Sequence, residues 1–150
     1  MKGIDAIRRL KGIFDAVYHV SALFPDNTSL TWTMTAHATA HTWSDWTEIA
    51  DSGATKLSAS YTTEKGHITA IEIETLSEID TIYIYELAWG AGKTVFARGR
   101  AGGGTKFHNP ITTERFWPPN FPKSQLLYYR MKTATGVADT CTAHIRHHAD

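Results

Sequence analysis

The chain has 150 residues, 42% of them hydrophobic, which is enough for one domain with a substantial core. Its 15 basic and 15 acidic residues cancel, and this neutrality excludes long-range attraction to nucleic acid or to an anionic membrane as a partner. No apolar run approaches the ~20 residues of a membrane span. A single cysteine, Cys141, excludes an internal disulfide. The charged N-terminus is unlike a secretion signal, so we expect a soluble protein kept inside a cell.

The first segment, residues 2–20, has a helical period. Its apolar residues recur at intervals of three, four and three and form one stripe, Ile7, Leu10, Phe14 and Val17. Pro25 and the Asp-Asn pair after it favour a turn that ends the helix. We therefore expect residues 1–24 to form an amphipathic helical arm that packs on its own domain or on a neighbouring subunit.

The pattern then changes to alternation. Residues 29–41 read SLTWTMTAHATAH, in which apolar and polar side chains alternate without a break. A period of two places all the apolar side chains on one face of a strand. This run predicts a β-strand with one buried face.

Similar segments follow along the rest of the chain. Residues 45–53 form a connection with room for one helical turn, and Gly66 and Gly90 mark hairpin turns. Further strands are predicted over residues 55–63, 67–76, 80–89, 93–100, 125–132 and 138–148. About eight strands at intervals of roughly ten residues predict an all-β fold over residues 28–150, an antiparallel β-sandwich that is jelly-roll-like.

Two groups of residues invite a catalytic or nucleotide-binding interpretation. Residues 90–94, GAGKT, resemble the end of a phosphate-binding loop. However, Leu87 occupies the position where that motif requires an earlier glycine, and a strand pattern follows, so we expect a hairpin turn. Glu72 and Glu74 would lie ~6.6 Å apart on one strand face, near the spacing of paired glycosidase acids. Neighbouring residues on one face of an exposed sheet often have this spacing, so it does not indicate a catalytic pair. We expect no catalytic residues, no cofactor and no enzyme activity.

The histidines raise the question of a metal site. Two pairs share a strand face, His37 with His41 and His144 with His148. Four residues along a strand span ~13 Å, so neither pair can chelate zinc alone. A site would need neighbouring strands or a subunit interface, and we predict no metal. Titration of these histidines could instead make assembly sensitive to pH.

The aromatic residues are numerous and include five tryptophans, Trp32, Trp43, Trp46, Trp89 and Trp117. We expect them mainly in the core and in seams between subunits, although a sugar-binding module would display some on an exposed face. The proline-rich loop over residues 116–122 is a different case, because it holds aromatic rings that are costly to expose. It predicts partner contacts through Phe116, Trp117 and Phe121.

Residues 80–148 resemble a β-sandwich module of tailed-bacteriophage virion proteins. The resemblance is carried by strand and turn motifs: Tyr85-Glu86-Leu87, Gly90-Ala91, Phe121-Pro122, Tyr129-Arg130-Met131, Gly136, and the strand from Asp139-Thr140-Cys141 to His147-His148. The N-terminal segment lies outside the matching part. The resemblance implies a structural protein of the virion, made in the host cytoplasm.

Members of this family serve as capsid cement or decoration proteins, head fibres, or parts of tail fibres and spikes, generally as trimers. The resemblance thus implies a homotrimer whose partner is the major capsid protein or another virion protein. We expect a cement protein that bridges capsid subunits through the helical arm and the loop of residues 116–122. The alternative is a tail fibre or tailspike module that binds a receptor or a carbohydrate.

Overall fold

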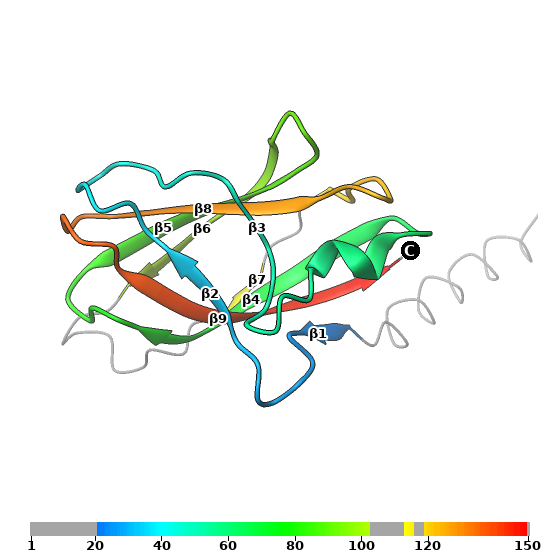
Figure 1. The fold of residues 1–150 in the computed structure, drawn as a ribbon, viewed down its shortest axis with the longest axis horizontal. Helices are drawn as coiled ribbons and strands as arrows, with labels where there is room; N and C mark the ends of the chain where they lie inside the picture. Colours follow the sequence, from blue (N-terminus) through cyan, green and yellow to red (C-terminus); the bar gives the residue numbers. More distant parts are fainter. Residues whose placement is uncertain (1–20, 103–112, 116–118, 150) are drawn as a thin grey trace, which may run out of the picture.

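The computed structural model describes residues 21–102, 113–115 and 119–149 (Figure 1). These residues form β-strands and one short 3-10 helix, η1 (Leu57–Tyr61). The strands are β1 (Ala22–Phe24), β2 (Trp32–Thr35), β3 (Thr47–Glu48), β4 (Gly66–Leu76), β5 (Ile82–Trp89), β6 (Thr94–Gly102), β7 (Thr113–Arg115), β8 (Leu127–Thr133) and β9 (Thr140–Ala149). The prediction of an all-β fold is confirmed for the described part of the chain.

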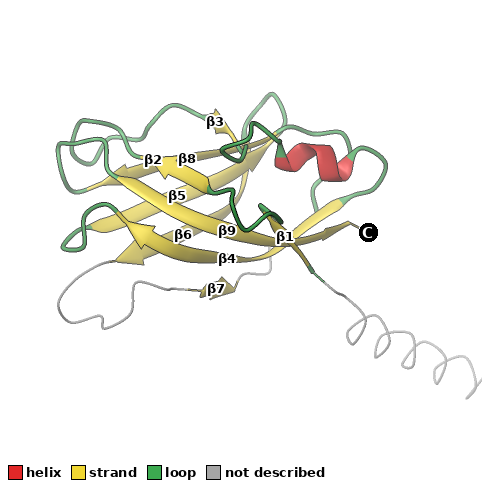
Figure 2. Ribbon diagram, turned by 60° about the horizontal axis from the view of Figure 1, so that its bottom comes forward, coloured by secondary structure: helices red, strands yellow, loops and turns green. Residues whose placement is uncertain are grey.

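The strands form two antiparallel sheets. One has the order β1-β9-β4-β7, with β2 also paired to β9, and the other has the order β3-β8-β5-β6. β1 and β2 share one edge of β9, because β1 pairs with residues 145–147 and β2 with residues 140–143. From β2 onward the chain changes sheet at every connection except the β5–β6 hairpin. Figure 2 shows the resulting layers of strands, with η1 (red) at the end near β1.

One hydrophobic core forms from the inward side chains of both sheets. β8 illustrates the alternation, because Leu127, Tyr129 and Met131 are buried while the residues between them are partly exposed. Trp32 of the first sheet packs edge-on against Tyr129 of the second, with 5.8 Å between ring centroids. Cys141 is also buried in this core.

The long alternating run is a strand only in its first part. β2 ends at Thr35, and Ala36 is the last buried apolar residue of the run. The chain then leaves β9 and follows the end of β8, where the amide of His41 donates to the carbonyl of Thr133 (2.8 Å). Residues 37–41 therefore do not continue β2 along β9, and the His41 amide bonds to the other sheet instead.

Two connections also differ from the prediction. Residues 55–63 contain η1 instead of a strand, because Leu57 and Tyr61, one helical turn apart, are both buried while Ala59 is exposed. Residues 45–53 contain the two-residue strand β3, which pairs with β8, instead of a helical turn. The GAGK segment after β5 is a hairpin turn, as predicted, with positive φ angles at Gly90 and Lys93.

The boundary of the β domain lies earlier than expected. Residues 22–24 were expected at the end of the helical arm, but they form β1 and pair with β9. This correction has a tertiary cause, since β9 offers an unpaired edge beyond β2 that β1 extends. The rest of the expected arm, residues 1–20, lies outside the described residues.

Candidate functional site

The outer face of the β3-β8-β5-β6 sheet concentrates basic side chains. Antiparallel register places Arg98, Glu86 and Arg130 side by side on three neighbouring strands, and residues opposite one another point to the same face. We call the surface formed by the following cations the basic face: Lys93, Arg98, Arg100, Arg130 and Lys132. Its residues come from β6, β8 and the β5–β6 turn.

A buried carboxylate holds two of these cations. Glu86 is fully buried although it points outward, because the two arginine side chains cover it. Nε of Arg98 donates to Oε1 of Glu86 (2.7 Å), and Nε of Arg130 donates to Oε2 (2.7 Å). Arg130 adds a second contact from Nη2 to Oε2 at 2.6 Å. Each carboxylate oxygen thus has its own guanidinium, a strong, directional arrangement.

The two arginines determine the charge state of Glu86. Burial by itself raises the pKa of this carboxyl, but hydrogen bonds and charge from Arg98 and Arg130 outweigh burial and leave the pKa below its ordinary value. Glu86 therefore stays ionised at neutral pH. The cluster of one carboxylate and two guanidinium groups carries a net positive charge.

Aromatic rings position the cations of the basic face. The guanidinium carbon of Arg130 lies 4.6 Å from the ring centroid of Trp43 and 4.5 Å from that of Trp46. Nζ of Lys132 lies 4.6 Å from the Trp43 centroid. Nζ of Lys93 lies 3.2 Å from the ring centroid of Tyr128. These are cation–π distances, so each of these cations is stabilised by at least one aromatic ring.

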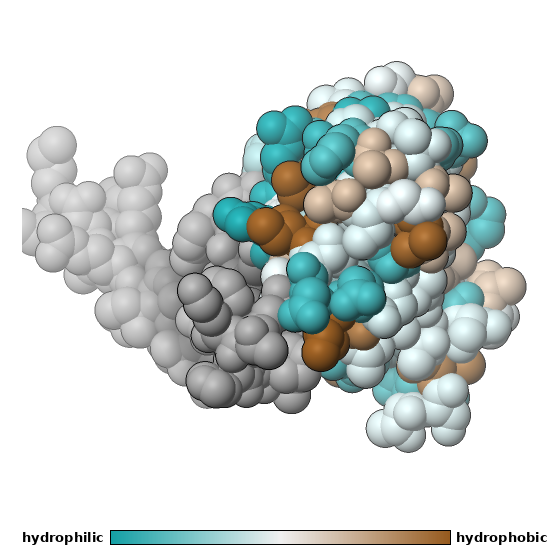
Figure 3. All heavy atoms as spheres, turned by 90° about the vertical axis from the view of Figure 1, so that its left-hand side faces the viewer, coloured by the Kyte–Doolittle hydropathy of each residue, from teal (hydrophilic) through white to brown (hydrophobic). Residues whose placement is uncertain are grey.

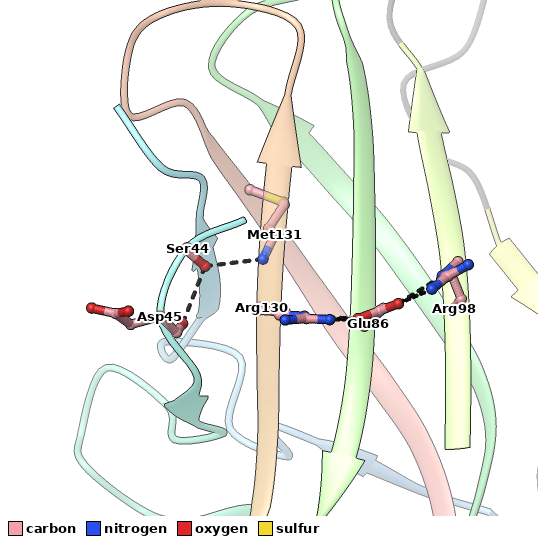
Figure 4. A network of polar contacts seen from close by, with 6 residues as sticks. All are labelled: Ser44, Asp45, Glu86, Arg98, Arg130 and Met131. Carbon is pink, nitrogen blue, oxygen red and sulfur yellow. Dashed lines mark hydrogen bonds and ion pairs between the residues drawn. The ribbon is translucent and has the colours of Figure 1, made fainter. Parts of the chain in front are cut away.

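The loop that carries the two tryptophans is tied to β8. The amide of Ser44 donates to the carbonyl of Met131 (2.9 Å), and the amide of Met131 donates to Oγ of Ser44 (3.0 Å). Oγ of Ser44 also donates to the carbonyl of Asp45 (3.2 Å), while the Asp45 carboxylate points away from Glu86 (Figure 4). These bonds fix the backbone between Trp43 and Trp46.

The other outer face, on the sheet of β4 and β9, carries two glutamates that are each paired with a basic side chain. Glu72 is ion-paired with Arg146, and Oε1 of Glu74 lies 2.9 Å from Nδ1 of His144. Both carboxylates that suggested paired acids are thus each held by a residue of β9. The basic face and this face lie on opposite sides of the domain, since they belong to different sheets.

The residues predicted to contact a partner fall into two groups. Most of them lie outside the described residues, namely Ile7, Leu10, Phe14, Val17, Phe116 and Trp117. Phe121 is described and is 1% exposed, packed against Tyr61 with 4.8 Å between ring centroids. The structure therefore corrects the prediction for Phe121, whose ring fills the core because backbone hydrogen bonds to Gly66 draw it inward.

Exposed apolar side chains occur at the end of the domain that holds the β4–β5 and β8–β9 connections. Ile79 and Val137 are the most exposed large hydrophobic residues in the described part of the chain. Figure 3 views this end, and its hydrophobic residues (brown) are separated by hydrophilic ones (teal). The visible described surface here is mixed in character, unlike the basic face.

A groove of about 500 Å³ lies between β1 and η1. Its lining includes Ala22–Phe24, Lys56, Ala59 and His147. His147 is 6% exposed, and its Nδ1 has no hydrogen-bond partner among the described residues. Burial, with a further contribution from His148, lowers the pKa of His147 to about 4, which Asp26 partly opposes. The His147 ring is therefore neutral at pH 7.

The shifted pKa of His147 predicts a loss of stability in acid. The folded state holds the proton less tightly (pKa about 4) than the unfolded state (6.5). Stability is therefore complete above pH 6.5 and declines as the pH falls toward 4. We expect the free energy of unfolding to drop by about 2 kcal/mol between pH 7 and pH 5 from this group. Denaturant titrations at both pH values measure the drop, and parallel profiles for the wild type and His147→Phe would contradict the assignment.

The Glu86 cluster was missed by sequence reasoning. Glu86 and Arg130 drew attention only as parts of strand motifs in the phage resemblance, and Trp43 and Trp46 were assigned to the core or to subunit seams. The available signal was a charged residue at an outward position in each of three apolar strands. Which of these residues become neighbours depends on strand register, which the signal does not contain.

Comparisons with protein-family models, with curated proteins and with solved structures found no match to this chain. Within the described ranges, no three His, Cys, Asp or Glu side chains are grouped so that they could hold a metal ion. A helix long and apolar enough to cross a membrane is likewise not found among the residues that the structure describes.

Proposed function

We propose that this chain is a structural protein of a tailed-bacteriophage virion, built on a jelly-roll β-sandwich. The strand order carries the proposal. If β1 and β2 are counted together as the first strand, the orders β2-β9-β4-β7 and β3-β8-β5-β6 correspond to the two sheets of an eight-stranded jelly roll. This architecture recurs in viral capsid domains, as well as in lectins and cupins. The motif resemblance over residues 80–148 is our reason for proposing the virion among these classes.

Within the virion, the proposed role is that of a capsid cement or decoration protein. A partner that binds only the assembled shell stabilises it by mass action, by ~2.7 kcal/mol per site at a hundredfold excess over Kd. A trimer would place three copies of each contact around one axis and bridge several capsid subunits. The segment of residues 1–20 and the aromatic pair Phe116 and Trp117 are the proposed contacts with the major capsid protein.

The second candidate is a tail fibre or tailspike module that binds a receptor carbohydrate. The observation that favours it is the partial exposure of Trp43, Trp46 and Tyr128 on one outer face. Jelly rolls also serve as lectins. Binding on a glycan array that is lost in Trp46→Ala, with the fold intact, would favour this function over cement.

A truncation tests the cement role. Deleting residues 1–20 leaves every described strand, because β1 begins at Ala22. We expect the truncated protein to fold and to unfold as cooperatively as the full chain, but to coat capsids lacking the protein at least tenfold less well than the full chain. The measurement is a co-sedimentation assay with capsids, accompanied by electron microscopy of native virions. Undiminished coating would remove the arm from the mechanism, and absence of the protein from purified virions would overturn the virion role.

A further inference from the structure

The chain is neutral as a whole, but its charge is distributed unevenly between its two outer faces. The basic face holds four cations with described contacts, Lys93, Arg98, Arg130 and Lys132. The carboxylate between Arg98 and Arg130, that of Glu86, is fully buried. Arg100 is a further exposed cation of this face. The acidic residues beside this face include Asp45 and Glu48, and Glu48 is ion-paired with Lys56. A partner approaching this face therefore meets predominantly positive charge.

The aromatic rings of this face are already in contact with cations. The Trp43 ring contacts both Arg130 and Lys132, and the Tyr128 ring contacts Lys93. A neutral sugar needs a free aromatic face to stack on, whereas here the cations compete for the ring faces. The rings and arginines together have the composition typical of protein–protein binding hot spots, which are enriched in Trp, Tyr and Arg.

The cations are also held in place before any partner binds. Glu86 and the two tryptophans restrict Arg130, and Arg98 is anchored through Oε1 of Glu86 even though its side chain is 68% exposed. A restricted side chain loses less conformational entropy on binding than a free one. The positive groups lie on neighbouring strands, so several carboxylates of one partner can reach them at once.

We propose that the basic face is a docking surface for an acidic protein surface, in which carboxylates of a neighbouring virion subunit pair with Lys93, Arg98, Arg130 and Lys132. This inference rests on the proposed structural role, and it names the chemistry of the partner. Charge complementarity of this kind raises the association rate and sets the orientation of docking. It also makes docking weaken as salt rises.

The test uses the purified full chain and a carboxylate probe, poly-L-glutamate, with binding followed by tryptophan fluorescence at two salt concentrations. The test variant is Lys93→Gln/Lys132→Gln, which leaves the Glu86 cluster intact. The matched control is Lys65→Gln/Lys123→Gln, which removes two exposed lysines outside the basic face. We expect binding to weaken with salt, the test variant to bind about tenfold more weakly, and the control to bind like the wild type.

Three results would overturn the inference: no binding of poly-L-glutamate, equal loss in the test and control variants, or tighter binding of heparin or single-stranded oligothymidylate at equal charge. The last would point to an acidic glycan or a nucleic acid as the ligand. Because no virion is present in this assay, it is independent of the virion role. If the protein is absent from virions but binds polyglutamate through the basic face, the proposed virion function is wrong. The basic face would still be a docking surface for carboxylates.

Discussion

Replacing Arg130 with methionine is expected to lower the free energy of unfolding by about 3 kcal/mol. Methionine keeps an unbranched stem beside Trp43 and Trp46 and removes only the guanidinium. Glu86 would then keep Arg98 as its one described cation, and Arg98 is 68% exposed. A buried charge left with a weaker partner costs more than the ion pair itself contributes. Urea denaturation at pH 7 measures the change.

A second substitution distinguishes this explanation from lost packing. In Glu86→Leu/Arg130→Met the uncompensated carboxylate is gone, so we expect most of the lost stability to return, since apolar replacements of buried ion pairs are often neutral. Arg98→Met, at the more exposed end of the cluster, should cost less than Arg130→Met. Equal instability of the single and double variants would show that the arginine stem, rather than the charge, stabilises this face.

The Glu86 cluster also makes stability depend on pH, but the physical cause differs from that of His147: ion pairing lowers the pKa of Glu86, whereas burial lowers that of His147. The pKa of Glu86 is lowered in the folded state, so the stability it provides is complete above the unfolded carboxyl pKa of about 4.3 and is lost as the pH falls below that value. The loss expected from His147 occurs at higher pH, between 6.5 and about 4. Comparison of Glu86→Leu/Arg130→Met with the wild type below pH 4.5 isolates the contribution of Glu86.

Replacing Gly66 with alanine is expected to destabilise the domain by about 3 kcal/mol through overpacking. A Cβ atom at Gly66 would overlap the Cε2 and Cζ atoms of Phe121 and would lie 2.8 Å from Cδ1 of Tyr61. The Phe121 ring cannot retreat easily, because it packs against Tyr61 and Phe96 and its backbone is hydrogen-bonded to Gly66 in both directions. Thermal and urea unfolding measure the loss.

The chain offers a matched control for this substitution. A Cβ at Gly92, in the β5–β6 turn, would meet no atom within 4 Å, so Gly92→Ala should leave stability within about 1 kcal/mol of the wild type. Gly66→Ala/Phe121→Leu, with a smaller side chain opposite the new methyl group, should recover part of the loss. An unchanged stability in Gly66→Ala would mean that Phe121 does not occupy the core in solution, and its predicted role as a partner contact would then stand again.

The strands themselves were largely predictable from the sequence. β5, β8 and β9 lie within two residues of the predicted boundaries at each end. Apolar and polar residues alternate in β8 and β9, and β5 is rich in β-branched and aromatic residues. Alternation is a local property, so it can be recognised without knowledge of the neighbouring strands. The same signal overextended β2, since residues 37–41 keep the pattern while the amide of Thr39 donates to Nδ1 of His37 and that of His41 to the carbonyl of Thr133.

The candidate site could not be predicted in the same way. Arg98 and Arg130 stand 12 and 44 residues from Glu86 along the chain, and only the register of β6, β5 and β8 makes them neighbours. Trp43 and Trp46 reach this face because hydrogen bonds between Ser44 and Met131 bring their loop onto β8. Neither relation leaves a periodic trace in the sequence.

By itself, then, the sequence determined the all-β class, most of the strands and their inward faces, because side-chain alternation and turn residues act over a few neighbours. The tertiary structure decided which outward residues meet and which aromatic rings are covered. Phe121 entered the core and Glu86 became buried on an outer face. The physical reason is that burial and ion pairing depend on residues brought together by strand pairing across the chain, and the energy of those contacts overrides the local preference of each segment.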